Sequence, residues 1–150
     1  MFDGIDRKII GKLSKNGRLS LTEISEGTGI SRVAVASRID KLEKSGLLKV
    51  CAALNLEKLN YQTLLVELQV EKTKTAAFRK LVENNPRVLH CFEITGPFNH
   101  LLICSARNNQ TLRVFIENEL KKFAKDCRVT LSSNSMTPNY VPIKFLEEEW

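Results

Sequence analysis

The stretch from Gly29 to Gly46, GISRVAVASRIDKLEKSG, constrains the fold of this chain more than any other. A turn residue, a serine that can cap a helix, fourteen helix-compatible positions and a closing glycine predict one helix with both ends marked. On a 3.6-residue period, Val35, Ile39 and Leu42 share one face of this helix. We therefore expect that face to pack on a core.

The opposite face of the same helix is short, small and basic near its start. It carries Val33, Ser37, Asp40, Lys41 and Lys44, and Arg32 and Arg38 flank it. A surface of this kind can lie in the major groove of DNA without steric conflict. We interpret the stretch as a recognition helix, and the alternative is an ordinary amphipathic surface helix.

The residues before this helix predict two more helices. Ile5, Ile9 and Leu13 share one helical face, and the S-x-x-E pattern from Ser20 to Glu23 is a capping box that opens a shorter helix. A tight glycine turn then leads into the recognition helix. The three segments predict a helix-turn-helix headpiece, with a generic three-helix bundle as the alternative.

The next segment separates two domains. Residues 47–54 read LLKVCAAL, a short β-prone piece that can close the headpiece, and residues 55–60 read NLEKLN, which we interpret as a hinge. We assign residues 1–50 to a DNA-binding domain, residues 51–63 to a hinge strand and linker, and residues 64–150 to a second domain.

The second domain alternates between strand and helix patterns in the order β-α-β-β-α-β. Strands are expected at residues 64–70, 88–95, 99–106 and 127–133, and helices at residues 75–84 and 110–124. This order predicts a ferredoxin-like domain, in which one antiparallel sheet has helices on one face only. The fold class is therefore α+β.

The uncovered face of that sheet is expected to be apolar. Depending on register, either Leu89, Cys91 and Glu93 or Val88, His90, Phe92 and Ile94 point away from the helices. Because exposing apolar surface costs roughly 25 cal/mol per Å², we expect this face to pack on a second subunit. The alternative is a monomer whose tail, residues 134–150, covers the patch.

The charge, the lengths of apolar runs and the cysteine spacing indicate which partners and which cell compartment to expect. The net charge is +6, and residues 1–50 hold 10 Lys and Arg against 6 Asp and Glu, which points to a polyanionic partner. No apolar run approaches the roughly 20 residues that cross a bilayer, and the start MFDGIDRK lacks the apolar core of a signal peptide, so we expect a cytoplasmic protein with no membrane contact. The cysteines, Cys51, Cys91, Cys104 and Cys127, form no C-x-x-C pair, so free thiols and no metal site are expected.

Catalysis finds no support in the sequence. There is no nucleophile elbow, no Walker loop and no histidine-rich cluster. The two histidines, His90 and His100, fall in or beside predicted strands, where a lone histidine is usually structural. We therefore expect no catalytic residues and no cofactor.

Over nearly its whole length the chain resembles the Lrp/AsnC, or feast/famine, transcription regulators. The similar segments are FDGIDRKIIGKLSKNGR, SLTEIS, GISRVAVASRIDKLEKSGLLK and EITGPFNHLLI. The resemblance implies a winged helix-turn-helix, a hinge strand, and a ferredoxin-like (RAM/ACT-like) domain that dimerises and often binds an amino acid between dimers. The sequence departs from the family at Asn60-Tyr61, where Gly-Tyr is common, and at Asn99, where an aspartate is usual.

Two other functions fit this architecture. The sirohaem decarboxylases resemble the same family and use its two-domain frame for tetrapyrrole chemistry, but they predict a weakened recognition helix. Sequence-independent DNA compaction differs from regulation only in the ratio of specific to non-specific affinity. Our leading hypothesis is a sequence-specific regulator, a dimer that can assemble further to a tetramer or octamer, on a pseudo-palindromic operator in double-stranded DNA.

The predicted DNA contacts lie along the recognition helix, at Ser31, Arg32, Val33, Ser37, Arg38 and Lys41. Ser31 can offer its amide or hydroxyl to a phosphate, the basic side chains can reach phosphates or guanine edges, and Val33 can meet a thymine methyl group. Arg38 sits at the margin of the core stripe, so its alternative role is to brace the helix.

The predicted effector site combines a turn with a facing strand. Its residues are Thr95, Gly96, Pro97, Phe98, Asn99, Thr130, Ser132 and Ser133. Gly96 lets a ligand carboxylate approach backbone amides, and the hydroxyl groups can complete an amino-acid cage at a contact between dimers. In the resembling family the aspartate after this turn helps to hold the ligand's ammonium group. The alternative is a tight turn that serves only assembly.

Overall fold

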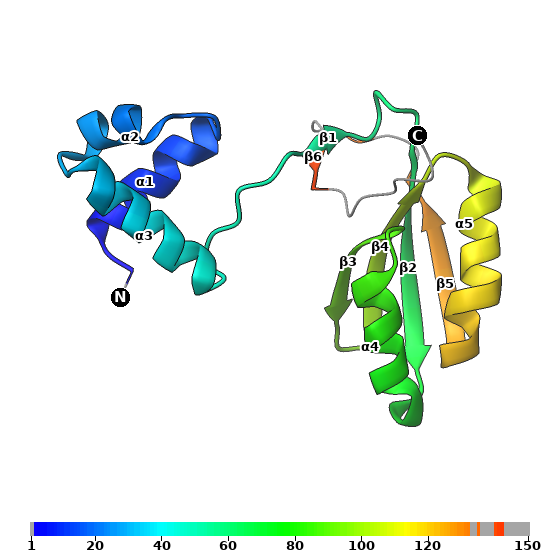
Figure 1. The fold of residues 1–150 in the computed structure, drawn as a ribbon. Helices are drawn as coiled ribbons and strands as arrows, with labels where there is room; N and C mark the ends of the chain where they lie inside the picture. The colour runs from blue at the N-terminus through cyan, green and yellow to red at the C-terminus, as the bar shows by residue number, and fades with distance from the viewer. Residues whose placement is uncertain (1, 133–134, 136–139, 143–150) are drawn as a thin grey trace. The chain divides into compact units, whose positions relative to one another are not determined.

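The computed structural model describes residues 2–132, 135 and 140–142. The chain divides into two compact units, Met1–Cys51 and Ala52–Trp150, each with its own elements (Figure 1). The first unit holds helices α1 (Gly4–Lys15), α2 (Leu21–Thr28) and α3 (Arg32–Lys44). The three helices predicted from the sequence are therefore present, in the predicted order.

Polar side chains fix where these helices begin. The predicted capping box is confirmed at α2, where the Glu23 amide donates to Ser20 Oγ at 3.3 Å and the Ser20 amide donates to Glu23 Oε2 at 2.7 Å. Ser31 caps α3 through a 3.2 Å bond from the Ala34 amide. Each bond satisfies an amide that the helix itself leaves unpaired.

One apolar cluster holds the three helices together. Ile9, Ile24 and Val35 are almost fully buried, one from each helix. Burial of each such side chain contributes roughly 1.5–3 kcal/mol. The predicted stripe of α3 is confirmed, because Val35 and Leu42 are buried and Ile39 packs against the cluster. Gly46 follows α3 with a φ of +73°, a conformation that favours glycine.

The β-prone piece at residues 47–54 does not form the expected strand. Residues 47–53 form no strand, and β1 (Leu54–Asn55) pairs with β6 (Tyr140–Val141) in the second unit. A single extended segment without a partner leaves its backbone groups unpaired, so the β-prone composition of this piece does not suffice. Asn60 then turns the chain with a φ of +58°, which asparagine tolerates better than most residues.

The second unit contains the predicted βαββαβ order. Its elements are β2 (Gln62–Val70), α4 (Thr75–Asn84), β3 (Val88–Glu93), β4 (His100–Ala106), α5 (Asn109–Phe115) and β5 (Ala124–Leu131). A 3-10 turn precedes α4, and α5 continues as a π turn (Ile116–Leu120) and a 3-10 turn (Lys121–Phe123).

The four long strands form an antiparallel sheet in the order β3-β4-β2-β5. Helices α4 and α5 lie along one face of it, as Figure 1 shows. Between them and the sheet lies the core, which includes Val66, Leu68 and Leu102 from the strands and Phe78 and Phe115 from the helices. The ferredoxin-like prediction is therefore confirmed.

Neither of the two predicted sets of β3 residues points away from the helices as a whole. Val88 pairs with Cys104 and His90 with Ile103, so Leu89 forms a bulge. Because the extra residue reverses the alternation, Val88 and Cys91 both face the helices. His90 and Phe92 face the other way, and their rings stack with centroids 6.0 Å apart.

The open face of the sheet, opposite the helices, is partly apolar. Its apolar members are Leu65, Phe92, Leu101 and Ile103. Leu65 is 36% exposed and Phe92 is 48% exposed. A second subunit is predicted to pack on this open face. Among the described residues, no helix is long and apolar enough to cross a membrane.

Candidate nucleic-acid interface and effector site

One side of α3 is exposed over its whole length. Arg32, Val33, Ser37 and Lys41 are all accessible to solvent, and Val33 leaves 80% of its surface uncovered. Arg32 and Lys41 make no ion pair within the part of the chain that the structure describes. The helix therefore presents an uncovered methyl-bearing side chain beside cations that are free to reach a polyanion.

The start of α3 adds hydrogen-bond donors. Ser31 Oγ accepts the Ala34 amide, which leaves the hydroxyl hydrogen free to donate. The first amides of a helix point outward and carry the positive end of its dipole. This end of α3 can bind a phosphate oxygen, as the sequence analysis expects for Ser31.

Arg38 is engaged inside the unit. Its Nη1 lies 2.7 Å from Asp3 Oδ2 and 2.8 Å from Asp6 Oδ1. The same two carboxylates cap α1, because Asp3 Oδ1 accepts the Ile5 and Asp6 amides and Asp6 Oδ2 accepts the Asp3 amide. Arg38 thus ties α3 to the beginning of α1. These contacts favour the bracing role over a direct contact with DNA.

The charges of this network stabilise one another. The backbone hydrogen bond from Asp6, followed by the Arg38 guanidinium, lowers the pKa of Asp3 to about 2. The pKa of Asp6 is lowered by the Asp3 amide and by Arg38, and the two carboxylates raise the pKa of Arg38. This network was not predicted from the sequence, although an aspartate at the N-cap of α1, Asp3, and one in its first turn, Asp6, were visible signals.

The predicted effector turn divides into exposed and buried halves. Thr95, Gly96 and Pro97 are exposed, and Gly96 has a φ of +136°. Phe98 is only 4% exposed, and the Arg128 guanidinium lies 5.0 Å from its ring centroid. Phe98 therefore packs into the domain. Only the first three residues of the turn are exposed and accessible to a ligand.

Asn99 is occupied by the protein itself. Its Oδ1 accepts the Val70 amide at 2.8 Å, and its Nδ2 donates to the Val70 carbonyl at 2.9 Å. His100 Nδ1 lies 2.8 Å from the same Oδ1. Asn99 Oδ1 was the expected acceptor for a ligand's ammonium group. It already accepts hydrogen bonds from two donors of the protein.

Within one chain, the facing strand does not reach the turn. Thr130 pairs with Leu65, and the Ser132 amide donates to the Thr63 carbonyl. The turn meets β2 at its other end, beside Val70. Along β2, Leu65 is five residues and Thr63 seven residues from Val70, which corresponds to roughly 17 and 23 Å. A cage that uses both parts therefore takes the turn and the strand from different chains. Ser133 lies outside the described residues.

The cysteines are free thiols, as the sequence predicts. Cys104 is buried in the core, and burial raises the pKa of its thiol to about 12. Burial also raises the pKa of Cys91 and of Cys127. No group of three metal-ligating side chains occurs in the parts of the chain that the structure covers.

Comparison with known proteins agrees with this architecture. The AsnC-type helix-turn-helix domain matches residues 2–43, and the Lrp/AsnC ligand binding domain matches residues 63–139. The regulator LrpA of Bacillus subtilis is 32% identical over 127 residues, which cover 83% of this chain and 93% of that protein. FL11 of Pyrococcus furiosus is 30% identical and covers 78% of this chain and 79% of that protein.

Solved structures share the fold. A transcriptional regulator of Neisseria meningitidis, whose structure is a complex with L-Met, is 26% identical, with a TM-score of 0.76 over 91% of this chain and 93% of that one. The leucine response regulatory protein of Mycobacterium tuberculosis has a TM-score of 0.81 at 22% identity, over 90% of this chain and 94% of that one. The chain belongs to the Lrp/AsnC family of helix-turn-helix transcriptional regulators.

Proposed function

We propose that this protein regulates transcription by binding duplex DNA sequence-specifically through α3. The main support for this proposal is the exposed side of that helix. Val33 is 80% exposed there, and Arg32 and Lys41 make no ion pair with any described residue. Val33 contacts a thymine methyl group, and the two cations bind phosphates or guanine edges. Ser31 and Ser37 complete the contact, and Arg38 positions the helix through Asp3 and Asp6.

The acting species in this proposal is a dimer formed through the open face of the sheet. Leu65, Phe92, Leu101 and Ile103 leave water when two such faces meet, which supplies the hydrophobic driving force. Residues 51–63 link the sheet domain to the headpiece. Two headpieces then read half-sites about one helical turn, or a multiple, apart, so the operator is a pseudo-palindrome. Dimers assemble further into a tetramer or octamer.

The effector in this proposal is an amino acid bound between dimers. The N. meningitidis relative is solved with L-Met, which supports this ligand class. Backbone amides at Thr95 and Gly96 take the ligand carboxylate, and Thr130 and Ser132 come from another chain. Asn99 is neutral and already bonded to Val70, so it holds an ammonium group weakly there.

Footprinting on the DNA upstream of the protein's own gene tests this function, because regulators of this family often control themselves. The proposal predicts a protected, pseudo-palindromic region that withstands competition by excess unrelated DNA. Uniform protection that competitor DNA removes would instead support sequence-independent compaction. In the proposal the protein acts in the cytoplasm and performs no catalysis.

A further inference from the structure

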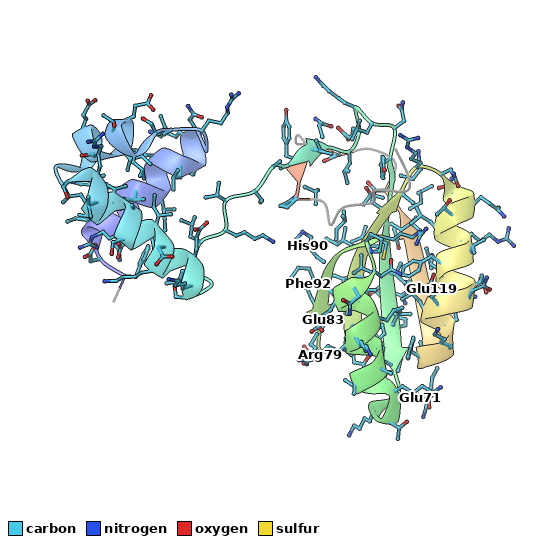
Figure 2. All side chains as sticks on the ribbon, viewed as in Figure 1. Glu71, Arg79, Glu83, His90, Phe92 and Glu119 are labelled. Carbon is cyan, nitrogen blue, oxygen red and sulfur yellow. The ribbon has the colours of Figure 1, made fainter. Side chains whose placement is uncertain are left out.

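A cavity of about 300 Å³ lies between α4 and the edge strand β3. Phe78, Val82 and Leu89 give it an apolar lining, and Arg79, Glu93 and His100 add polar groups. In Figure 2, Arg79 and Glu83 lie on α4 beside the strand that carries His90 and Phe92. Residues 95–97 do not line this cavity, although Glu93 and His100, which flank the turn, do.

His100 brings a defined hydrogen-bond acceptor to this cavity. Asn99 Oδ1 accepts the Val70 amide while Nδ2 donates to the Val70 carbonyl, which fixes the orientation of the amide. Because that oxygen lies against His100 Nδ1, the proton of the neutral ring sits on Nδ1. Burial lowers the pKa of His100, which keeps the ring neutral near neutral pH. Nε2 therefore keeps its lone pair.

That lone pair has no donor among the described residues. His100 is only 8% exposed, and its ring edge packs against Phe78 with centroids 4.9 Å apart. Because His100 lines the cavity, a ligand there that donates a hydrogen bond can pair with this acceptor.

Two charged groups stand beside this acceptor. Glu93 pairs directly with His100 across the two strands, and Arg79 Nη2 lies 3.3 Å from Glu93 Oε1. The Arg79 and Glu93 side chains are 64% and 72% exposed, so water screens their attraction and a ligand can replace it. A ligand with both an ammonium and a carboxylate group can pair with Glu93 and Arg79 in place of their own ion pair.

We propose that this cavity binds a free apolar α-amino acid at a site distinct from the effector turn. The ligand's ammonium group donates to Glu93 and to His100 Nε2, and its carboxylate pairs with Arg79. Its side chain contacts Phe78, Val82 and Leu89. A cavity of this size stands at the lower end of the range for small-molecule sites, which suits one amino acid rather than a nucleotide.

L-Leucine and two fragments of it test this assignment by calorimetry on the full-length protein without DNA. L-Leucine is expected to bind, 3-methylbutylamine to bind more weakly because it lacks the carboxylate, and 4-methylpentanoate to give no heat because it lacks the ammonium group. The histidine ring nitrogens provide a second readout, since the chain has two histidines and a His90→Gln variant assigns the signals. Leucine is expected to shift the Nε2 resonance of His100.

Glu93→Gln is the decisive variant, because Glu93 is exposed and the change keeps its shape. Removal of its charge should weaken leucine binding about tenfold. The matched control is Glu117→Gln, which removes an exposed carboxylate from the π turn after α5 and should leave binding unchanged. Absence of leucine binding, binding that Glu93→Gln leaves intact, or binding that does not shift the Nε2 resonance of His100 would each overturn the proposal. Footprinting without leucine tests the proposed function separately.

Discussion

The side-chain amide of Asn99 pairs with both backbone polar groups of Val70, as a neighbouring strand would. Val70 N–H donates to Asn99 Oδ1 at 2.8 Å, and Asn99 Nδ2 donates to the Val70 carbonyl at 2.9 Å. The backbone pairing of β2 with β4 ends at Leu68 and His100, so this side chain extends the sheet beyond the last paired residues. Asn99 thereby anchors the turn that precedes β4.

Replacement of Asn99 by alanine should destabilise the protein. Both Val70 groups are partly buried and would be left without their partners, so the free energy of unfolding should fall by about 1–3 kcal/mol. Urea denaturation measures this change. Asn118→Ala alters an exposed asparagine and should stay within roughly 0.5 kcal/mol of the original protein. Equal effects of the two variants would show that the Asn99 bonds contribute nothing to stability.

Replacement of Asn99 by aspartate tests the contact between the side chain of residue 99 and His100 Nδ1. The carboxylate keeps an acceptor at Nδ1 but adds a negative charge there, which stabilises the imidazolium form. The pKa of His100, which burial lowers in the original protein, should therefore rise in Asn99→Asp. An NMR titration of the ring protons follows this directly. If the pKa of His100 does not change, the two side chains are not in contact in solution.

The contact of Arg38 with Asp3 and Asp6 should make the headpiece sensitive to acid. The folded-state pKa of Asp3 is about 2, below its ordinary 3.8, and that of Asp6 is also lowered. Carboxylates with lowered pKa values stabilise the fold above their unfolded pKa, and this stabilisation disappears as the pH falls through the folded value. Stability should therefore drop between about pH 4 and about pH 2.

An Arg38→Gln variant separates this contact from general acid effects. It should melt at a lower temperature than the original protein near neutral pH, and the difference should narrow in acid as the aspartates become protonated. Lys44→Gln, which removes only an exposed pair with Asp40, should melt like the original protein at every pH. A difference between Arg38→Gln and the original that stays constant with pH would contradict the ion-pair account.

The proposed dimer depends on the open face of the sheet. Phe92→Asp places an unpaired charge within the proposed buried contact, so this variant should be monomeric at micromolar concentration. Val114→Asp changes a side chain of similar exposure, 46% against 48%, on the helical side and should remain dimeric. Light scattering measures the molar mass, and hence the oligomeric state, of each variant. A dimeric Phe92→Asp protein, or a monomeric original, would exclude this interface.

Local patterns explain which parts of the fold could be predicted. The stripe of Val35, Ile39 and Leu42 and the capping box of Ser20 and Glu23 depend on residues within a few positions of one another, so sequence spacing reveals them. The βαββαβ order followed from the change of period between strands and helices.

The missed features depend on distant residues or on a break in a period. Arg38 and Asp3 are 35 positions apart, and Asn99 and Val70 are 29 apart, so no local pattern pairs them. The bulge at Leu89 reverses an alternation that the sequence shows as continuous. The β-prone piece expected to close the headpiece forms no strand over residues 47–53, because none of the described headpiece residues forms a strand with which it could pair.

The salt dependence of DNA binding by an Arg32→Ala, Lys41→Ala double variant tests the central claim most directly. Gel shifts on the protein's own upstream DNA should show weaker binding, with a salt slope shallower by roughly one unit for each phosphate that the variant no longer neutralises. The control, Lys80→Ala with Arg107→Ala, removes the same charge from exposed positions of the second unit and should bind like the original protein. Unchanged affinity and slope in the α3 variant, or an equal weakening in the control, would contradict recognition of DNA by α3.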